Sequence, residues 1–281
     1  MREKILIENE LYVGERPLFG LKNADIKNTI FGEGESPLKH ASDITVRDCG
    51  FKWKYPIWYA DNVDVKNTAW FFMARAGVWY CSNIKIDSCV IEAPKNFRRC
   101  NGLTVKNTNL ADAAETLWNC DGVDIDNVQA KGDYFAMNSR NINVNNLTLC
   151  GNYSFDGGEN IEMHNSKLLS KDAFWNCKNV TVYDSYISGE YIGWNSENLT
   201  FINCTIESLQ GFCYINNLKL ENCRLPNTTL AFEYSTVNAD IKGDIESVFN
   251  PRSGSIKADK INKLIIEKDK VDPQKTNIIA V

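Results

Sequence analysis

A short phrase returns about every twenty residues through most of this chain, and it constrains the fold more than any other feature. The phrase alternates apolar and exposed residues and then ends in Asn, Asp or Ser. That last position is occupied by Asn28, Asp48, Asn67, Ser88, Asn107, Asn127, Asn146, Asn165, Asp184, Asn203 and Asn222. A repeat of this length with strand-like alternation is typical of a β-solenoid, in which each turn stacks on the one before. The sequence therefore predicts an all-β chain whose equivalent residues lie about 4.8 Å apart.

The amide side chain suits such a stack because it carries both hydrogen-bond donors and acceptors. We therefore interpret the Asn positions as an asparagine ladder that satisfies the bend after each strand. A second column, just before each strand, exchanges Asn with Gly, as at Asn83 and Gly102. Both residue types tolerate the left-handed backbone conformation, so this column predicts tight turns and no ligand site.

The apolar positions of the phrase, such as Ile44 and Val46, are expected to point inward, as is a third column that includes Phe51. We predict a single domain, a right-handed parallel β-helix of about eleven to twelve coils over residues 17–249. Residues 1–16, with strands at 5–7 and 11–13, are predicted to form an N-terminal cap, and residues 250–281 a C-terminal cap and tail. Such caps protect the end strands of a solenoid from pairing with other chains.

Charge and composition argue against several classes of partner. The net charge is −5 and the pI is near 5.3, which disfavours a nucleic-acid partner because phosphate contacts need a basic surface. The N-terminal residues have neither a signal peptide nor a membrane-spanning pattern, so a cytoplasmic location is expected. The oligomeric state is left open.

Eight of the ten cysteines occupy repeat positions where other coils have residues such as Ala, Ser or Thr, so we expect small, buried, reduced thiols. No CxxC pair is present, and His40 and His164 are the two histidines, so neither a metal site nor a cofactor is predicted. The absence of a P-loop and of a dinucleotide fingerprint argues against nucleotide-dependent chemistry.

The phrases VKNTAW, IDSCVI, VKNTNL, FINCTI and LENCRL, with WNC and WNS between them, resemble the bacterial domain-of-unknown-function family numbered 3737. More broadly, the chain resembles the pectate-lyase-like superfamily of single-stranded right-handed parallel β-helices. The resemblance covers nearly the whole chain and implies the fold. It implies no reaction, because the NTD, DD, GHG and RIK elements of polygalacturonases are missing and fold alone does not give function.

A column five residues before each strand is unusually aromatic and is expected to face outward. Its members are Phe19, Lys39, Trp58, Trp79, Arg98, Trp118, Met137, Asp156, Trp175, Trp194 and Cys213, which we call the tryptophan ridge. Flat rings suit the apolar faces of sugars, so the ridge predicts an oligosaccharide site. The predicted ligand-binding residues are Trp58, Trp79, Trp118, Tyr134, Tyr153, Trp175, Tyr191 and Trp194. Two alternatives remain: loops could bury the ridge as core, or the ridge could be a protein interface of a scaffold protein.

Carboxylates in and beside the ridge allow a catalytic hypothesis. Asp156 interrupts the tryptophans, and Asp172 and Glu190 lie in the loops of the following coils. A carboxyl group between apolar rings has a raised pKa and can act as a general acid, with a second carboxylate as base. Asp156 with Asp172 or Glu190 could therefore form a glycosidase pair, or these residues could be ordinary solvated surface.

Overall fold

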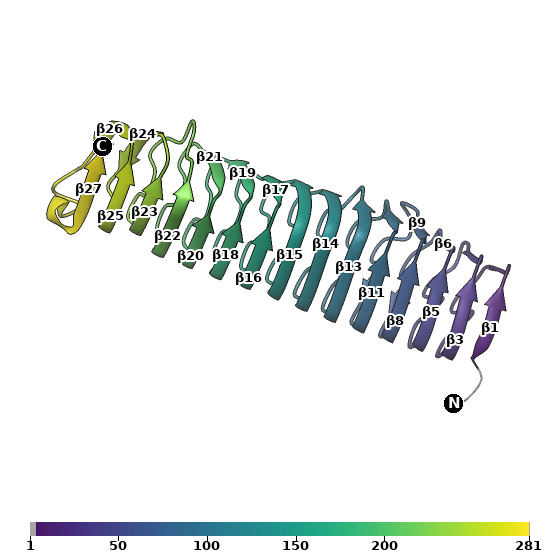
Figure 1. Ribbon diagram of the computed structural model, residues 1–281. Helices are drawn as coiled ribbons and strands as arrows, with labels where there is room; N and C mark the ends of the chain where they lie inside the picture. The colour runs from purple at the N-terminus through teal and green to yellow at the C-terminus, as the bar shows by residue number, and fades with distance from the viewer. Residues whose placement is uncertain (1–3, 281) are drawn as a thin grey trace. The chain divides into compact units, whose positions relative to one another are not determined.

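The computed structural model describes residues 4–280. The chain divides into two compact units, residues 1–142 and 143–281, and each unit is described by itself. In both, strands of successive coils lie side by side as parallel arrows (Figure 1). Each unit is thus a parallel β-solenoid. The single domain expected from the sequence stays a prediction.

The first unit has three strand positions in a coil. Its long strands are β1 (Ile5–Glu8), β3 (Lys22–Lys27), β5 (Ser42–Arg47), β8 (Asp61–Lys66), β11 (Ser82–Asp87), β13 (Asn101–Leu110) and β14 (Asp121–Lys131). Shorter strands follow the bend: β2 (Leu11–Tyr12), β4 (Ile30–Phe31), β6 (Gly50–Phe51), β9 (Ala69–Trp70) and β12 (Val90–Ile91). At the third position β7 (Ile57–Trp58) pairs with β10 (Val78–Trp79).

The second unit repeats this arrangement. After β15 (Arg140–Cys150), which begins in the first unit, the long strands are β16 (Glu159–His164), β18 (Lys178–Tyr183), β20 (Glu197–Ile202), β22 (Asn216–Cys223), β23 (Thr236–Ile241), β25 (Ser253–Ala258) and β27 (Thr276–Ala280). The shorter strands are β17 (Lys167–Leu169), β19 (Tyr186–Gly189) and β21 (Thr205–Ser208). β24 (Asp244–Phe249) pairs with β26 (Lys260–Ile265), and one 3₁₀ turn, η1, covers Pro273–Lys275.

Strand register follows the predicted apolar columns. Ile44 pairs with Val63, Val63 pairs with Ile84, and all three side chains are at most 2% exposed. Inward aromatic rings also stack between coils: Phe51 lies 4.8 Å from both Phe31 and Trp70, measured between ring centres. The alternation of the sequence therefore specifies which side of each strand is core.

The Asn and Gly column before each strand and the Asn column after it both have a left-handed backbone conformation. The residues before the strands, such as Asn83 (φ 55°) and Gly102 (φ 70°), confirm the predicted turns. The column after the strands is also left-handed, as at Asn127 (φ 54°) and Asn203 (φ 55°). Exposed amides connect some neighbours within this column: Asn127 Nδ2 donates to Asn107 Oδ1 at 2.9 Å, and Asn203 Nδ2 donates to Asp184 Oδ1 at 3.1 Å. Backbone conformation thus gives a reason for Asn that the sequence interpretation did not include.

The end segments contain strands that pair in parallel with the coils next to them, and their role as caps stays a prediction. β1 pairs with β3 and β2 pairs with β4, while β25 pairs with both β23 and β27. The described residues consequently form more coils than the eleven to twelve counted from the phrase. The count was low because the first coil, in which Asn9 (φ 61°) shares the column of Asn28, was left out of it, and because the last coils lack the Asn phrase but keep the apolar alternation.

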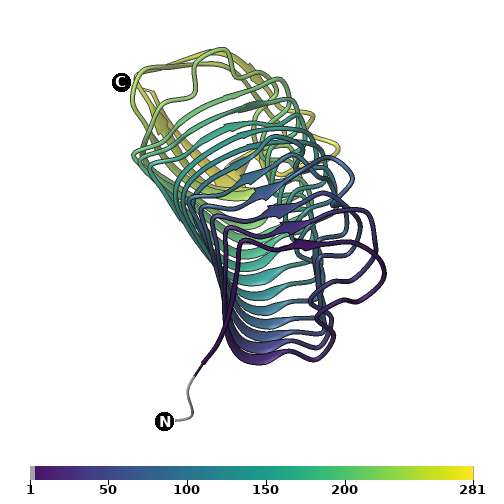
Figure 2. The same ribbon diagram turned by 90° about the vertical axis from the view of Figure 1, so that its right-hand side faces the viewer.

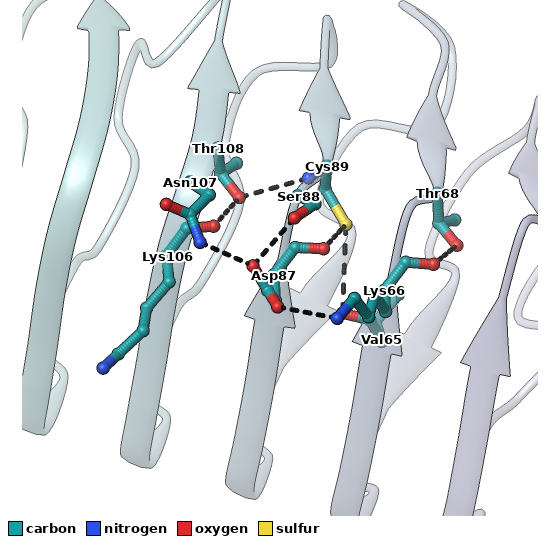
Figure 3. A network of polar contacts seen from close by, with 9 residues as sticks. All are labelled: Val65, Lys66, Thr68, Asp87, Ser88, Cys89, Lys106, Asn107 and Thr108. Carbon is teal, nitrogen blue, oxygen red and sulfur yellow. Dashed lines mark hydrogen bonds and ion pairs between the residues drawn. The ribbon is translucent and has the colours of Figure 1, made fainter.

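The predicted small buried cysteines occupy a polar position just after the bend. Cys89 Sγ lies 3.3 Å from the carbonyl oxygen of Asp87, and Thr108 Oγ1 donates to that of Lys106 at 2.6 Å (Figure 3). Across the coils, the Cys89 amide donates to Thr108 Oγ1 at 3.3 Å. The ten thiols are free, and nine are buried, with Cys150 exposed. Cysteine replaces Ser and Thr here because its thiol reaches the same carbonyl two residues back.

Candidate functional site

In the first unit, the tryptophan ridge is a closed stack. The rings of Trp58 and Trp79 are 5.1 Å apart and 7° from parallel. The Arg98 guanidinium lies 4.6 Å from the Trp79 ring centre and 4.5 Å from that of Trp118. The four side chains therefore cover one another's faces, and cation–π attraction adds to the stacking.

The indole edges of the ridge are also engaged. Trp58 Nε1 donates to the Ala76 carbonyl at 2.7 Å, and Trp79 Nε1 donates to that of Lys95 at 2.8 Å. Trp118 Nε1 donates to the carbonyl of Tyr134 at 2.6 Å. The indoles are half-buried, so the ridge is neither core nor an open platform. It supports the loop of the following coil while offering few free ring faces to a sugar.

In the second unit the ridge is less regular. The rings of Trp175 and Trp194 are 5.9 Å apart and tilted by 34°, and Trp175 Nε1 donates to the Tyr191 carbonyl at 2.7 Å. Tyr153 meets Trp175 edge to face at 89°, and Tyr191 meets Trp194 at 87°. The predicted aromatic residues of this unit thus lie together as one cluster.

An exposed aromatic column next to the ridge was not predicted. It follows the ridge by one residue and contains His40, Tyr59 and Tyr80, whose rings stack at 5.3 and 4.9 Å. Tyr59 is 44% and Tyr80 36% exposed. The dipeptides WY at 58–59 and 79–80 were the available signal, because neighbouring residues in a coil give neighbouring columns. His40, for which the sequence predicted no metal-binding role, contributes a ring to this column.

Of the predicted carboxylates, Asp172 has the most unusual surroundings. It is 1% exposed, and its Oδ1 has no hydrogen-bond partner. Burial raises the pKa of Asp172, against the lowering effects of the Lys171 charge and of a hydrogen bond with Tyr153. The charges of Glu190 and Asp156 raise its pKa further, and Glu190 pairs with Lys171 at 3.2 Å. The structure therefore brings the three predicted carboxylates together.

Asp172 is more deeply buried than Asp156. Asp156 is half-buried, and its Oδ1 accepts from Asn176 Nδ2 at 2.9 Å. The buried Asp172 thus has a raised pKa, which is the property that a general acid needs. The sequence could not locate it, because its burial depends on how the loop folds.

A polar groove of about 680 Å³ crosses several coils of the second unit at the bend before the shorter strands. Its lining consists of amides, hydroxyls, one carboxylate, one amine and one phenol. These residues are Asn146, Thr148, Asn165, Ser166, Lys167, Asp184, Ser185, Tyr186, Asn203 and Thr205, which together form what we call the bend groove. Sequence reasoning assigned the Asn column to turn structure and missed the hollow beside it.

The outward side chains of the bend groove are placed for hydrogen bonding. Thr148, Tyr186 and Thr205 have hydroxyl groups with no hydrogen-bond partner among the described residues. Lys167 Nζ lies 5.8 Å from the centre of the Tyr186 ring. Asp184 uses Oδ1 to accept from Asn203. The groove thus combines an aromatic ring with several polar groups at its surface.

The first unit has a smaller hollow of about 310 Å³ at the equivalent bend. Asp48, Asn67 and Ser88 occupy the bend column there, and Ala69 and Val90 occupy the positions that Lys167 and Tyr186 hold in the bend groove. The outward side chains at this hollow are therefore short and apolar, whereas those at the bend groove of the second unit are long and polar.

In the described part of the chain, no group of three or more His, Cys, Asp or Glu side chains is arranged to hold a metal ion. Likewise, residues 4–280 contain no helix with the length and apolar character needed to cross a membrane.

Comparison of the sequence with family models gives a match over residues 5–279 to DUF3737, described as a protein of unknown function. The chain belongs to this family. The match spans both units and agrees with the resemblance carried by the repeated phrases. No curated protein matches the chain by sequence.

Solved structures similar to this DUF3737 chain share little sequence with it. The surface protein and adhesin PfbA of Streptococcus pneumoniae is 8% identical, with a TM-score of 0.37 and coverage of 98% of this chain and 91% of that one. The A-module of the Azotobacter vinelandii mannuronan C-5 epimerase AlgE4 is 8% identical, with a TM-score of 0.29 and coverage of 98% and 88%. The Agl-KA catalytic domain is 13% identical, with a TM-score of 0.38 and coverage of 92% and 61%. None of these similarities identifies a function for this chain.

Proposed function

We propose that this protein binds an oligosaccharide in the bend groove of the second unit. The observation that carries the proposal is the lining itself, where polar side chains at the same position of successive coils surround one tyrosine ring. Sugar-binding sites need hydrogen-bond donors and acceptors for hydroxyl groups, together with an apolar surface for the ring.

The geometry of the coils supports a linear ligand. Successive coils are about 4.8 Å apart, a spacing comparable with the length of one sugar unit, so a chain along the groove meets the same type of side chain at each step. Thr148, Tyr186 and Thr205 supply hydroxyls that do not have to break a protein hydrogen bond first. The tryptophan ridge is the weaker candidate, because its ring faces are largely taken by neighbouring side chains.

The test is calorimetric titration with a panel of neutral and acidic oligosaccharides. We expect saturable binding that Tyr186→Ala weakens at least tenfold, while Trp175→Ala leaves the affinity unchanged. Loss of binding in Trp175→Ala alone would transfer the site to the ridge. Absence of binding across the panel would contradict the proposal for these ligand classes.

A second candidate, a carbohydrate-active enzyme, is favoured by one observation, the buried Asp172 with its unpaired Oδ1 beside Tyr153. A carboxyl group with a raised pKa can serve as the general acid that protonates a leaving oxygen, with Glu190 or Asp156 as the second carboxyl group of the pair. Reducing-end release from the oligosaccharides that bind would support this role. Turnover that persists in Asp172→Asn would contradict it.

A further inference from the structure

The first coil of the first unit has an open edge. Among the described strands, β1 pairs only with β3, and β2 only with β4. Figure 2 shows the first coil in purple at the front, with no described segment crossing it. One row of backbone amides and carbonyls of this coil therefore has no strand partner within residues 4–280, as at any edge strand.

Apolar side chains at this edge are exposed where their counterparts are core. Ile5 pairs with Ala24 in the inward column, yet Ile5 is 52% exposed and Ala24 is 0% exposed. Leu6, Leu11 and Val13 are 59%, 66% and 65% exposed. These residues continue the core pattern of the solenoid without a coil to cover them, so the edge is suited to receive another strand.

We propose that this edge pairs with the same edge of a second copy of this chain, with β1 antiparallel to its equivalent about a two-fold axis at Leu6. Each Leu6 then faces Leu6 of the second copy, and Ile5 faces Ile7 of the second copy. Lys4 faces Glu8 of the second copy. The contact is isologous and closes after two chains.

Side-chain parity selects this register. Ile5 and Ile7 occupy the columns of Ala24 and Ile26 and point inward, whereas Leu6 lies between them and points outward. Residues directly opposite in an antiparallel pair share a face, so an axis between two residues would set inward side chains against outward ones. An axis at Ile7 would place Leu6 opposite Glu8 and Ile5 opposite Asn9.

Charge supports the same register. With the axis at Leu6, a lysine and a glutamate oppose each other on both sides of the axis, which favours pairing of identical strands. Lys4 Nζ lies 2.8 Å from Asp25 Oδ1 in the single chain, and its side chain is 45% exposed. Asp25 also accepts from Thr45, so it retains a donor when Lys4 turns toward Glu8 of the second copy. This inference does not rest on the proposed sugar site.

Light scattering coupled to gel filtration gives the test. We expect the mass of two chains for the natural sequence and of one chain for Leu6→Lys, with unchanged far-ultraviolet circular dichroism. Leu169→Lys, at a 39% exposed strand position of the second unit, is the matched control and should leave the dimer intact. Lys4→Glu should raise the dissociation constant, and the double change Lys4→Glu with Glu8→Lys should restore it.

Disulfide trapping tests the register directly. Opposed Cα atoms in an antiparallel pair lie about 4.5–5.5 Å apart, within disulfide range. Leu6→Cys in a Cys150→Ser background should give a reducible dimer with diamide, which accepts the two electrons and two protons, whereas Leu169→Cys should not. A natural chain that is monomeric at every concentration, or a dimer that survives Leu6→Lys, would overturn the proposal.

Discussion

The two units have the same bend but different surfaces beside it. Asn67 and Asp184 are both left-handed, with φ of 48° in each, and both are followed by a buried hydroxyl residue. One position further, the first unit has Ala69 where the second has Tyr186. The associated hollows measure about 310 and 680 Å³.

This difference distinguishes the repeat positions that maintain the fold from the outward position that sets the surface. The inward residues and the left-handed bends are alike in both units, as the fold requires. The outward residue after the bend is free to vary, because it contacts solvent and is not constrained by the core. Changes at inward and bend positions should therefore affect stability in either unit, and changes at the outward position should affect binding in one.

The largest effect is expected from Trp70→Ala, which removes a fully buried ring beside Ala69. Large-to-small core changes of this kind destabilise by about 3–5 kcal/mol. Ile187→Ala, beside Tyr186 and equally buried, should lose about 2–5 kcal/mol. Chemical denaturation monitored by circular dichroism measures both. A loss below about 1 kcal/mol at either site would contradict an equivalent core in the two units.

A smaller effect is expected at the bend, where Asn127→Leu should destabilise by about 1–2 kcal/mol because leucine tolerates left-handed backbone poorly. Asn127→Gly is the informative companion, since glycine keeps the conformation and removes the side-chain amide together with its bond to Asn107. Near-wild-type stability of the glycine variant would assign the column to backbone conformation. Equal losses in both variants would instead support a stabilising asparagine ladder.

Protonation of one buried and one hydrogen-bonded carboxyl group should change the stability of the protein with opposite sign in the two units. Burial raises the pKa of Asp172 in the second unit, whereas hydrogen bonding from Asn107 lowers the pKa of Asp87 in the first. A raised carboxyl pKa means that ionisation opposes folding: this destabilisation is fully present above the folded value and disappears as pH falls through the folded value and below the ordinary one. The stability that Asp87 contributes is present above its ordinary pKa and is lost as pH falls through its folded value.

Asp172→Asn should therefore stabilise the protein at neutral pH, by on the order of 1 kcal/mol, because it removes a buried charge with an unpaired oxygen. Asp87→Asn should destabilise it. The difference in melting temperature between each variant and the natural chain should become smaller as the pH is lowered. Melting temperatures of the three proteins measured between about pH 3 and 7 provide the comparison. An Asp172→Asn variant that is less stable at pH 7 would show that the Tyr153 hydrogen bond and the Lys171 charge outweigh the cost of burial.

The sequence predicted the strands and their core-facing residues well, but it predicted the surfaces of the molecule poorly. Ile44 and Val46 could be assigned to the core because alternation alone decides the face of a strand. The tryptophan spacing was also visible, but the closure of the stack depends on Arg98 lying between two rings. The burial of Asp172 depends on loop conformation, which no repeat specifies. The first coil was predicted as a cap of short strands, and ILI and LYV carry the same apolar pattern as the coils that follow.

The smallest effect on stability is expected from exchanging the outward residues. Ala69→Tyr and Tyr186→Ala should each change the free energy of unfolding by less than about 0.5 kcal/mol, because neither residue is core. Their effects on oligosaccharide binding should differ. Tyr186→Ala should weaken binding, but Ala69→Tyr should add none, since its neighbours Gly50 and Val90 offer no polar side chain.

The same calorimetric panel checks this pair. A first unit that gains binding from Ala69→Tyr alone would mean that one ring at the bend is sufficient. The amides and hydroxyls around Tyr186 would then have no part in recognition. No gain in the first unit, with loss in the second, would place recognition in the combination of Tyr186 with Thr148, Lys167 and Thr205 across successive coils.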